Sequence, residues 1–311
     1  MSTYLVTGAA GFIGSNLVRG LLDRGESVRG IDNFATGRKS NLAGLLPRMR
    51  FREGDIRDRR DLEAIMPGVD FVLHQAAIPS VPRSVADPML SNDNNITGTL
   101  QVLLAARDFE VRRVVTASSS SVYGDTEVLP KSEHLPLNPL SPYALAKLTG
   151  EHYCRLFSNL YGLDTICLRY FNVFGPYQDP ASHYAAAIPK FIRRLRQGME
   201  PEIYGDGEQT RDFTYIANVV EANILASCVE TPGHHVCNIG CGERITVNRL
   251  VDCLRALLGV ATPARHLPPR PGDVRHSLAD ISRARELLGY EPKVRLEEAL
   301  HATVSWFLSR E

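Results

Sequence analysis

The sequence has no excess of charge of either sign. Its 311 residues include 35 lysines and arginines and 35 aspartates and glutamates, so the formal net charge at pH 7 is zero. A protein without net positive charge has no overall field that attracts a polyanion or an anionic membrane surface. The composition therefore argues against nucleic acid as a partner.

Long hydrophobic runs are also missing. No segment approaches the roughly 18 apolar residues that a membrane span requires. The chain begins Met-Ser-Thr-Tyr and enters an apolar run of only four residues, without the basic leader of an export signal. We therefore expect no membrane association and a cytoplasmic location.

Cysteines are few and scattered. The six cysteines lie mostly in apolar, periodic segments, which in a reducing compartment predicts buried thiols rather than disulfides. Cys237 and Cys241 follow two histidines, but their C-x3-C spacing is not that of a zinc knuckle. The sequence predicts no metal site.

What the sequence does contain is an alternation of short apolar strands and amphipathic helices. Strand 4–7, helix 12–22 and strand 28–31 form a βαβ unit, and the alternation continues to about residue 172. Beyond that point, longer loops rich in proline and glycine interrupt it. We expect an α/β fold, a doubly wound parallel sheet (Rossmann-like) with a smaller mixed α/β C-terminal lobe.

The turn after the first strand has the composition of a dinucleotide site. Gly8, Gly11 and Gly14 lie at G-x-x-G-x-x-G spacing between the strand and the following helix. Because glycine has no Cβ, the backbone can approach a pyrophosphate closely and the helix amides can face it.

The second strand ends at Asp32, where a carboxylate can accept hydrogen bonds from the adenosine ribose and repel a 2′-phosphate. This favours NAD over NADP, although Arg38 and Lys39 follow closely and keep NADP as the alternative. A simpler interpretation is that Asp32 only caps the loop before Asn33.

Tyr143 and Lys147 are separated by one helical turn, so they lie on one helix face. An ammonium beside the phenol would lower the pKa of Tyr143 from about 10 towards neutrality and make it a general base. Upstream, a strand at residues 114–115 runs into four serines at 118–121, which places hydroxyls at the carboxyl end of a sheet strand, where such folds bind ligands.

These motifs resemble the extended short-chain dehydrogenase/reductase family, and within it the nucleotide-sugar 4-epimerases. The resemblance covers essentially the whole chain and extends through these further segments: 54–56, 74–77, 95–99, 122–124, 168–176, 210–213 and 270–273. It implies an NAD-binding Rossmann domain at 1–172, to which later segments return, and a mainly substrate-binding lobe at 173–311.

The resemblance also implies roles for individual residues. Tyr143 would take the proton of a sugar C4 hydroxyl while NAD takes the hydride, and Ser119 would hold the oxygen through a hydrogen bond. Lys147 would bridge to the nicotinamide ribose. Which serine of 118–121 is catalytic stays open. The implied NAD contacts are Gly8, Gly11, Phe12, Ile13, Gly14, Asp32, Asn33, Asp55, Ile56, Ala76, Ala77, Asn95, Tyr143, Lys147 and Tyr170. The implied contacts to a UDP-sugar are Ser119, Ser120, Tyr143, Asn172, Ile188, Tyr204, Arg211, Arg270, Asp273 and Ser277.

The reaction is distinguished by which acids are absent. Dehydratases of the family resemble Thr-Asp-Glu, and uronate decarboxylases Thr-Ser-Glu, where this chain has three serines at 119–121. The resemblance thus implies a 4-epimerase. Ser277 occupies the position whose side chain, in the hexose 4-epimerases, forms a wall beside the sugar C2. Its small side chain leaves room for an N-acetyl group. This favours UDP-N-acetylglucosamine and UDP-N-acetylgalactosamine, with UDP-glucose and UDP-galactose as slower substrates, unless Ser277 is an ordinary loop serine.

Two alternatives stay open. His183 and Arg193 keep a UDP-glucuronate 4-epimerase or decarboxylase in consideration, because a C6 carboxylate needs a polar or cationic pocket. A dinucleotide-sensing regulatory protein is the non-enzymatic alternative. Helices near 94–107 and 143–160 resemble those that pair into a four-helix bundle in family dimers, which implies a homodimer.

Overall fold

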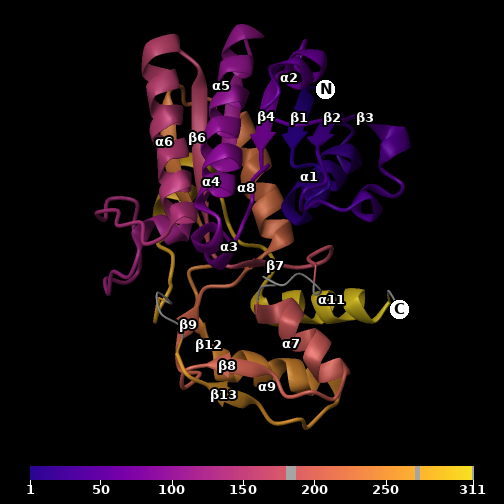
Figure 1. Ribbon diagram of the computed structural model, residues 1–311, viewed down its shortest axis with the longest axis vertical. Helices are drawn as coiled ribbons and strands as arrows, with labels where there is room; N and C mark the ends of the chain where they lie inside the picture. Colours follow the sequence, from indigo (N-terminus) through magenta and orange to yellow (C-terminus); the bar gives the residue numbers. More distant parts are fainter. Residues whose placement is uncertain (180–186, 270–273, 310–311) are drawn as a thin grey trace.

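A seven-stranded, fully parallel sheet forms the centre of the computed structural model, which describes residues 1–179, 187–269 and 274–309 (Figure 1). The strand order is β11-β6-β5-β4-β1-β2-β3. The strands are β1 (Thr3–Thr7), β2 (Ser27–Asp32), β3 (Arg50–Glu53), β4 (Phe71–His74), β5 (Arg113–Ser119), β6 (Asp164–Tyr170) and β11 (His234–Ile239). The predicted doubly wound sheet is confirmed.

Helices cover both faces of this sheet. Along β1, Tyr4 and Val6 pack beneath α1 and α8, whereas Leu5 between them packs on the opposite face with α2, α5 and α6. Such strands are apolar on both faces, which explains the continuous apolar runs in the sequence. The helices are α1 (Phe12–Asp23), α2 (Arg59–Ile65), α3 (Val81–Ala86), α4 (Pro88–Asn92), α5 (Gly98–Asp108), α6 (Pro142–Tyr161), α8 (Ile216–Cys228) and α10 (Ser282–Leu288).

Short turns of helix join these elements. The 3-10 segments are η1 (Lys39–Leu42), η2 (Leu46–Arg48) and η4 (Ser120–Tyr123), and η3 (Asp93–Thr97) is a π-helical turn that continues into α5. Helix α6 begins where the Ser141 hydroxyl accepts a hydrogen bond from the Ala144 amide, and it ends at Gly162 in the left-handed conformation. These two caps fix the two ends of the helix that carries Tyr143.

A second lobe lies below the sheet in Figure 1 and has its own apolar core. Its helices are α7 (Ala187–Arg196), α9 (Val247–Leu258) and α11 (Leu296–Leu308). Three two-stranded pairs complete it: β7 (Val173–Phe174) with β10 (Thr214–Tyr215), β9 (Thr210–Arg211) with β12 (Ile245–Thr246), and β8 (Glu202–Tyr204) with β13 (Arg265–Leu267).

Segments from the second half of the chain also complete the sheet domain. Strand β11 pairs with β6, α8 packs on α1, and α10 contacts β11. A division at residue 172, with such returns, stays our proposal for the domains. Within the described ranges, no helix is long and apolar enough to cross a membrane.

Candidate active site

A deep cavity opens at the carboxyl ends of the sheet strands. The glycine turn and Asp32 line one end, and Tyr143 and Lys147 line the other. Thirteen of the predicted cofactor residues line it: Gly8, Gly11, Phe12, Ile13, Gly14, Asp32, Asn33, Ile56, Ala76, Ala77, Tyr143, Lys147 and Tyr170. The cavity therefore extends from the glycine turn to Tyr143 and Lys147, which is the extended shape that a bound dinucleotide requires.

The glycine turn leaves room only for backbone. Gly8 has a φ of 68°, and a Cβ on it would lie 2.8 Å from the Ala76 nitrogen. A Cβ on Gly14 would lie 2.0 Å from the Gly8 carbonyl oxygen. Gly11 is the N-cap residue of helix α1, which has no side-chain cap and no acidic residue in its first turn. Its first amides are therefore available to an anion such as a pyrophosphate.

Asp32 is built to receive further hydrogen bonds. One carboxylate oxygen accepts from the Ala10 amide at 2.9 Å and the other from the Phe34 amide at 2.7 Å. Burial raises the pKa of Asp32, while these amides act in the opposite direction. A carboxylate has about four acceptor positions, so each oxygen keeps capacity for a ribose hydroxyl.

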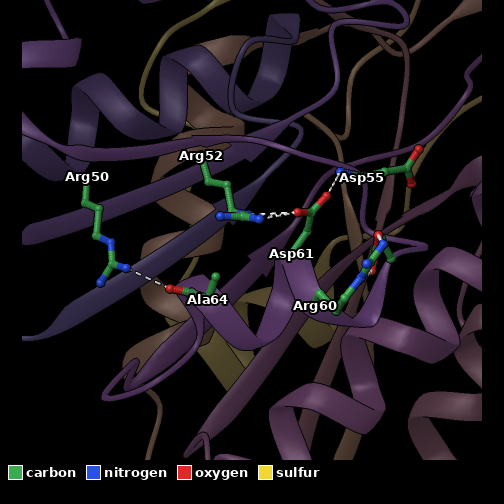
Figure 2. Close-up of polar contacts among 7 residues, drawn as sticks. Arg50, Arg52, Asp55, Arg60, Asp61 and Ala64 are labelled. Carbon is green, nitrogen blue, oxygen red and sulfur yellow. Dashed lines mark hydrogen bonds and ion pairs between the residues drawn. The ribbon is translucent and has the colours of Figure 1, made fainter.

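The turn at residues 54–56 forms another part of the cavity wall, and Asp61 of α2 holds it in place. The Asp61 carboxylate accepts from the Asp55 amide at 2.7 Å and from the Arg52 side chain at 2.9 Å (Figure 2). This keeps Gly54 and Ile56 on the cavity wall. The Asp55 carboxylate itself bonds Arg57, which lowers the pKa of Asp55 to about 2. Asp55 is thus placed beside the cavity, not on its wall.

The predicted contact Asn95 also lies behind the wall. Its side chain accepts from the Ile78 amide at 2.7 Å and donates to the Ile78 carbonyl at 3.1 Å, while Asn94 lines the cavity. The π-helical turn η3 adds a residue to the helical period, which changes the side chain that faces inward. Sequence spacing carries no signal of this shift.

A buried histidine organises the same wall. His74 bridges the Thr7 hydroxyl at 2.7 Å and the Thr99 hydroxyl at 2.9 Å, and Thr99 donates to the Asn95 carbonyl. Because the Thr99 proton is used there, Nε2 of His74 donates to Thr99 and Nδ1 accepts from Thr7. Burial lowers the pKa of His74 to about 3, so the ring is neutral. His74 therefore has a structural role, in which it links Thr7 and Thr99 beside the cavity.

Lys147 is anchored to the strand beneath Tyr143. Its ammonium donates to the Ala117 carbonyl at 2.7 Å and lies 5.9 Å from the centre of the Tyr143 ring. Burial lowers the pKa of Lys147 to about 8. Burial also raises the pKa of Tyr143, and the Ser119 hydroxyl lowers it in part. In the ligand-free protein the pKa of Tyr143 is therefore raised by burial, and the expected lowering towards neutrality by Lys147 is wrong for this state.

The structure separates the four serines. Ser118 donates to Glu151 at 2.5 Å and is thereby occupied. Ser119 accepts from the Ser121 amide and hydroxyl, and it is the serine whose hydroxyl acts on Tyr143. Ser120 begins η4 and is half-buried. Ser118 lines the cofactor cavity and Ser119 does not, so the choice of Ser119 as the catalytic serine stays a prediction.

The second lobe contributes a cleft lined by two predicted substrate residues. Tyr204 and Arg211 line it together with Gly205, Asp206, Gln209, Leu267, Pro269, Val274 and Arg275. Ser277 is 7% exposed, and its amide donates to the Thr210 carbonyl beside Arg211. Ile188 is buried in the core of the lobe. The predicted Arg270 and Asp273, and the alternative's His183, lie outside the described residues.

One residue that sequence reasoning missed ties these parts together. The buried Asp212 carboxylate accepts from the amides of Cys241, Gly242 and Ala279. Its backbone carbonyl accepts from the Asn172 side chain at 2.9 Å. Burial raises the pKa of Asp212 to about 6, against the effect of the three amides. Asp212 thereby sets Arg211, Asn172 and the segment that carries Ser277 relative to one another.

Comparison with known proteins gives a consistent picture. Residues 4–240 match the NAD dependent epimerase/dehydratase family. A UDP-N-acetylglucosamine 4-epimerase of Methanobrevibacter ruminantium, solved with UDP-N-acetylmuramic acid, is 42% identical, with a TM-score of 0.95 over 100% of this chain and 99% of that one. A Thermotoga maritima UDP-glucose 4-epimerase, solved with UDP-glucose, is 40% identical, with a TM-score of 0.94 over 99% of each chain. A Bacillus cereus UDP-glucuronic acid 4-epimerase, solved with NAD, is 35% identical, with a TM-score of 0.92 over 99% and 100%.

Proposed function

Because the chain belongs to the NAD-dependent epimerase/dehydratase family, we propose that it is a UDP-sugar 4-epimerase that interconverts UDP-N-acetylglucosamine and UDP-N-acetylgalactosamine. UDP-glucose and UDP-galactose are slower substrates in this proposal. NAD is the cofactor of the family and fits the glycine turn and Asp32 described above.

The observation that carries the proposal is that Tyr143 and Lys147 line the inner end of the cofactor cavity, with the Ser119 hydroxyl acting on Tyr143. Bound NAD supplies a hydride acceptor that can return the hydride to the same carbon. Tyr143 takes the proton of the C4 hydroxyl, and Ser119 donates a hydrogen bond to the C4 oxygen. Serines at 119–121 offer no carboxyl group for eliminating water or for decarboxylating a uronate.

The buried setting of Tyr143 has a consequence for this chemistry. In the ligand-free protein burial keeps the phenol protonated, and a neutral phenol cannot accept the C4 proton. A cofactor bound in the cavity would bring a cationic nicotinamide ring near Tyr143, and that charge, together with the Lys147 ammonium, would favour the phenolate.

Product analysis tests the proposal. The purified protein is incubated with NAD and, separately, with UDP-N-acetylglucosamine, UDP-glucose and UDP-glucuronate, and the products are identified by NMR. We expect UDP-N-acetylgalactosamine to form fastest. Conversion of UDP-glucose alone would contradict the preference for an N-acetyl group, and epimerisation or decarboxylation of UDP-glucuronate would instead support the uronate alternative.

Ser277→Tyr tests the size of the sugar pocket. A tyrosine in this buried position fills space beside Ser277, and we expect turnover of UDP-N-acetylglucosamine to fall about 10- to 100-fold, within the range of a few kcal/mol for a steric mismatch. Turnover of UDP-glucose by the same variant is the control and is expected to stay within a few-fold. Equal turnover of N-acetylated sugars by both proteins would contradict the size argument.

We further propose that the protein is a homodimer formed by α5 and α6 of two copies. Helix α6 exposes Leu145, Leu156, Leu160 and Tyr161, with exposed fractions of 46–68%. A run of large apolar side chains on one helix is typical of a helix-bundle interface.

Leu156→Glu combined with Leu160→Glu tests this interface. Because charges would be buried without partners, we expect the molar mass from light scattering to halve. Leu308→Glu on α11 is the matched control, since Leu308 is 49% exposed on a different helix. A wild-type mass in the α6 double variant would contradict this interface.

A further inference from the structure

A row of buried polar side chains crosses three strands directly behind the catalytic residues. Asn238 of β11, Arg169 of β6 and Ser118 of β5 are register partners, side by side across the sheet. Their exposed fractions are 0%, 3% and 3%. Polar side chains at one level of a sheet face the same way and can bond to a common partner.

Arg169 and Ser118 share one such partner, Glu151 of α6. Arg169 donates to both of its oxygens, from Nε at 2.9 Å and from Nη2 at 2.7 Å. Ser118 donates to the same carboxylate at 2.5 Å. The third arm of Arg169 donates to the Tyr123 hydroxyl at 2.9 Å, which in turn donates to Asn238 at 2.7 Å. Every charge in this network is matched inside the protein.

The network also connects to the helix that carries the base. Tyr143, Lys147 and Glu151 follow one another at four-residue intervals, so they share one face of α6. Lys147 holds the Ala117 carbonyl and Glu151 holds the Ser118 hydroxyl. The two residues of β5 immediately before Ser119 are therefore each fixed to α6.

Replacing a buried ion pair by apolar residues of similar volume is often neutral or stabilising, so stability alone does not account for this pair. We propose that Glu151 is a positioning residue: by binding Ser118 and Arg169 it fixes the end of β5 against α6, so that Ser119 and no other serine faces Tyr143. This inference rests on the proposed function, because Ser119 and Tyr143 must act on one oxygen.

Two variants test the inference. Glu151→Gln leaves one acceptor oxygen where Arg169 and Ser118 now donate to two. Ser118→Ala removes only the Ser118 hydroxyl and keeps the ion pair between Arg169 and Glu151. We expect each to lower kcat about 10- to 100-fold, as for a misplacement of about 1 Å, with KM within about twofold of wild type. Because Glu151 acts through Ser118, the double variant is expected to be no slower than Glu151→Gln alone.

Asp164→Asn is the matched control. Asp164 pairs with Arg113 at 3.2 Å at the opposite end of the same two strands, and we expect its kcat to stay within about twofold of wild type. Wild-type kcat in Ser118→Ala would overturn the inference, and so would losses that multiply in the double variant or an equal loss in Asp164→Asn. If Glu151→Gln does not fold, Ser118→Ala decides alone.

A readout without turnover separates this inference from the proposed function. With 13Cζ-labelled tyrosine, the Tyr143 signal is identified by its loss in Tyr143→Phe. We expect it to shift in Ser118→Ala and not in Asp164→Asn, whereas an unchanged signal in Ser118→Ala would overturn the positioning role. Absence of turnover by the wild-type protein would contradict the proposed function only.

Discussion

Tyr143→Phe is expected to lower kcat by about 100- to 10,000-fold, the range that general acid–base catalysis contributes. The substitution removes one hydroxyl and keeps the half-buried ring that lines the cofactor cavity. The affinity for NAD, measured by fluorescence titration, is expected to stay within a few-fold, because the glycine turn and Asp32 are unchanged.

The stability of the ligand-free protein is a control for this experiment, because the phenol of Tyr143 carries no charge in that state. Since burial raises that pKa, the free phenol is protonated across the physiological range, and substitution by phenylalanine should leave the stability of the ligand-free protein nearly unchanged. A variant that folds, binds NAD and still turns over at more than about a tenth of the wild-type rate would remove Tyr143 from the role of base.

Lys147→Met is expected to have the second-largest effect, a loss of kcat of about 100-fold or more. Methionine keeps much of the length of the side chain but cannot donate a hydrogen bond or favour the Tyr143 phenolate. NAD binding is expected to weaken as well, because Lys147 lines the cavity at its inner end. An activity within threefold of wild type would contradict the role of the ammonium.

The same variant has a measurable signature in stability against pH. In the folded protein the pKa of Lys147 is about 8, against 10.5 for the exposed side chain. Between these values the unfolded chain binds more protons, so the free energy of unfolding of the ligand-free protein rises with pH, by at most about 3 kcal/mol. Below pH 8 the full cost of burying the charge is present. Lys147→Met should lack this rise, which urea unfolding between pH 8 and 10.5 would measure.

The sheet could be predicted where its strands are apolar, and less well where they carry function. Residues 114–115 are apolar and indicated a strand, but β5 continues to Ser119. Its last residues are polar because Ser118 bonds Glu151, and Ser119 lies at the catalytic end. An alternation rule that counts apolar residues cannot identify polar strand residues whose partners lie on a distant helix.

Parts of the site depend on contacts that sequence spacing does not encode. Asp212 receives three amides from residues 241–279, so its role follows from the tertiary fold. Asn94 replaces Asn95 on the cavity wall because one turn is π-helical. By contrast, the glycine turn and Asp32 lie within one βαβ unit, and such a local motif could be identified from sequence alone.

The most direct test of a 4-epimerase that returns its hydride is the fate of the hydrogen at C4. UDP-N-acetylglucosamine is incubated with the protein and NAD in D2O, and the product is analysed by proton NMR. The account predicts UDP-N-acetylgalactosamine whose C4 position keeps its original hydrogen, because that hydrogen never exchanges with water. Deuterium at C4, or accumulation of a keto product without the epimer, would contradict it.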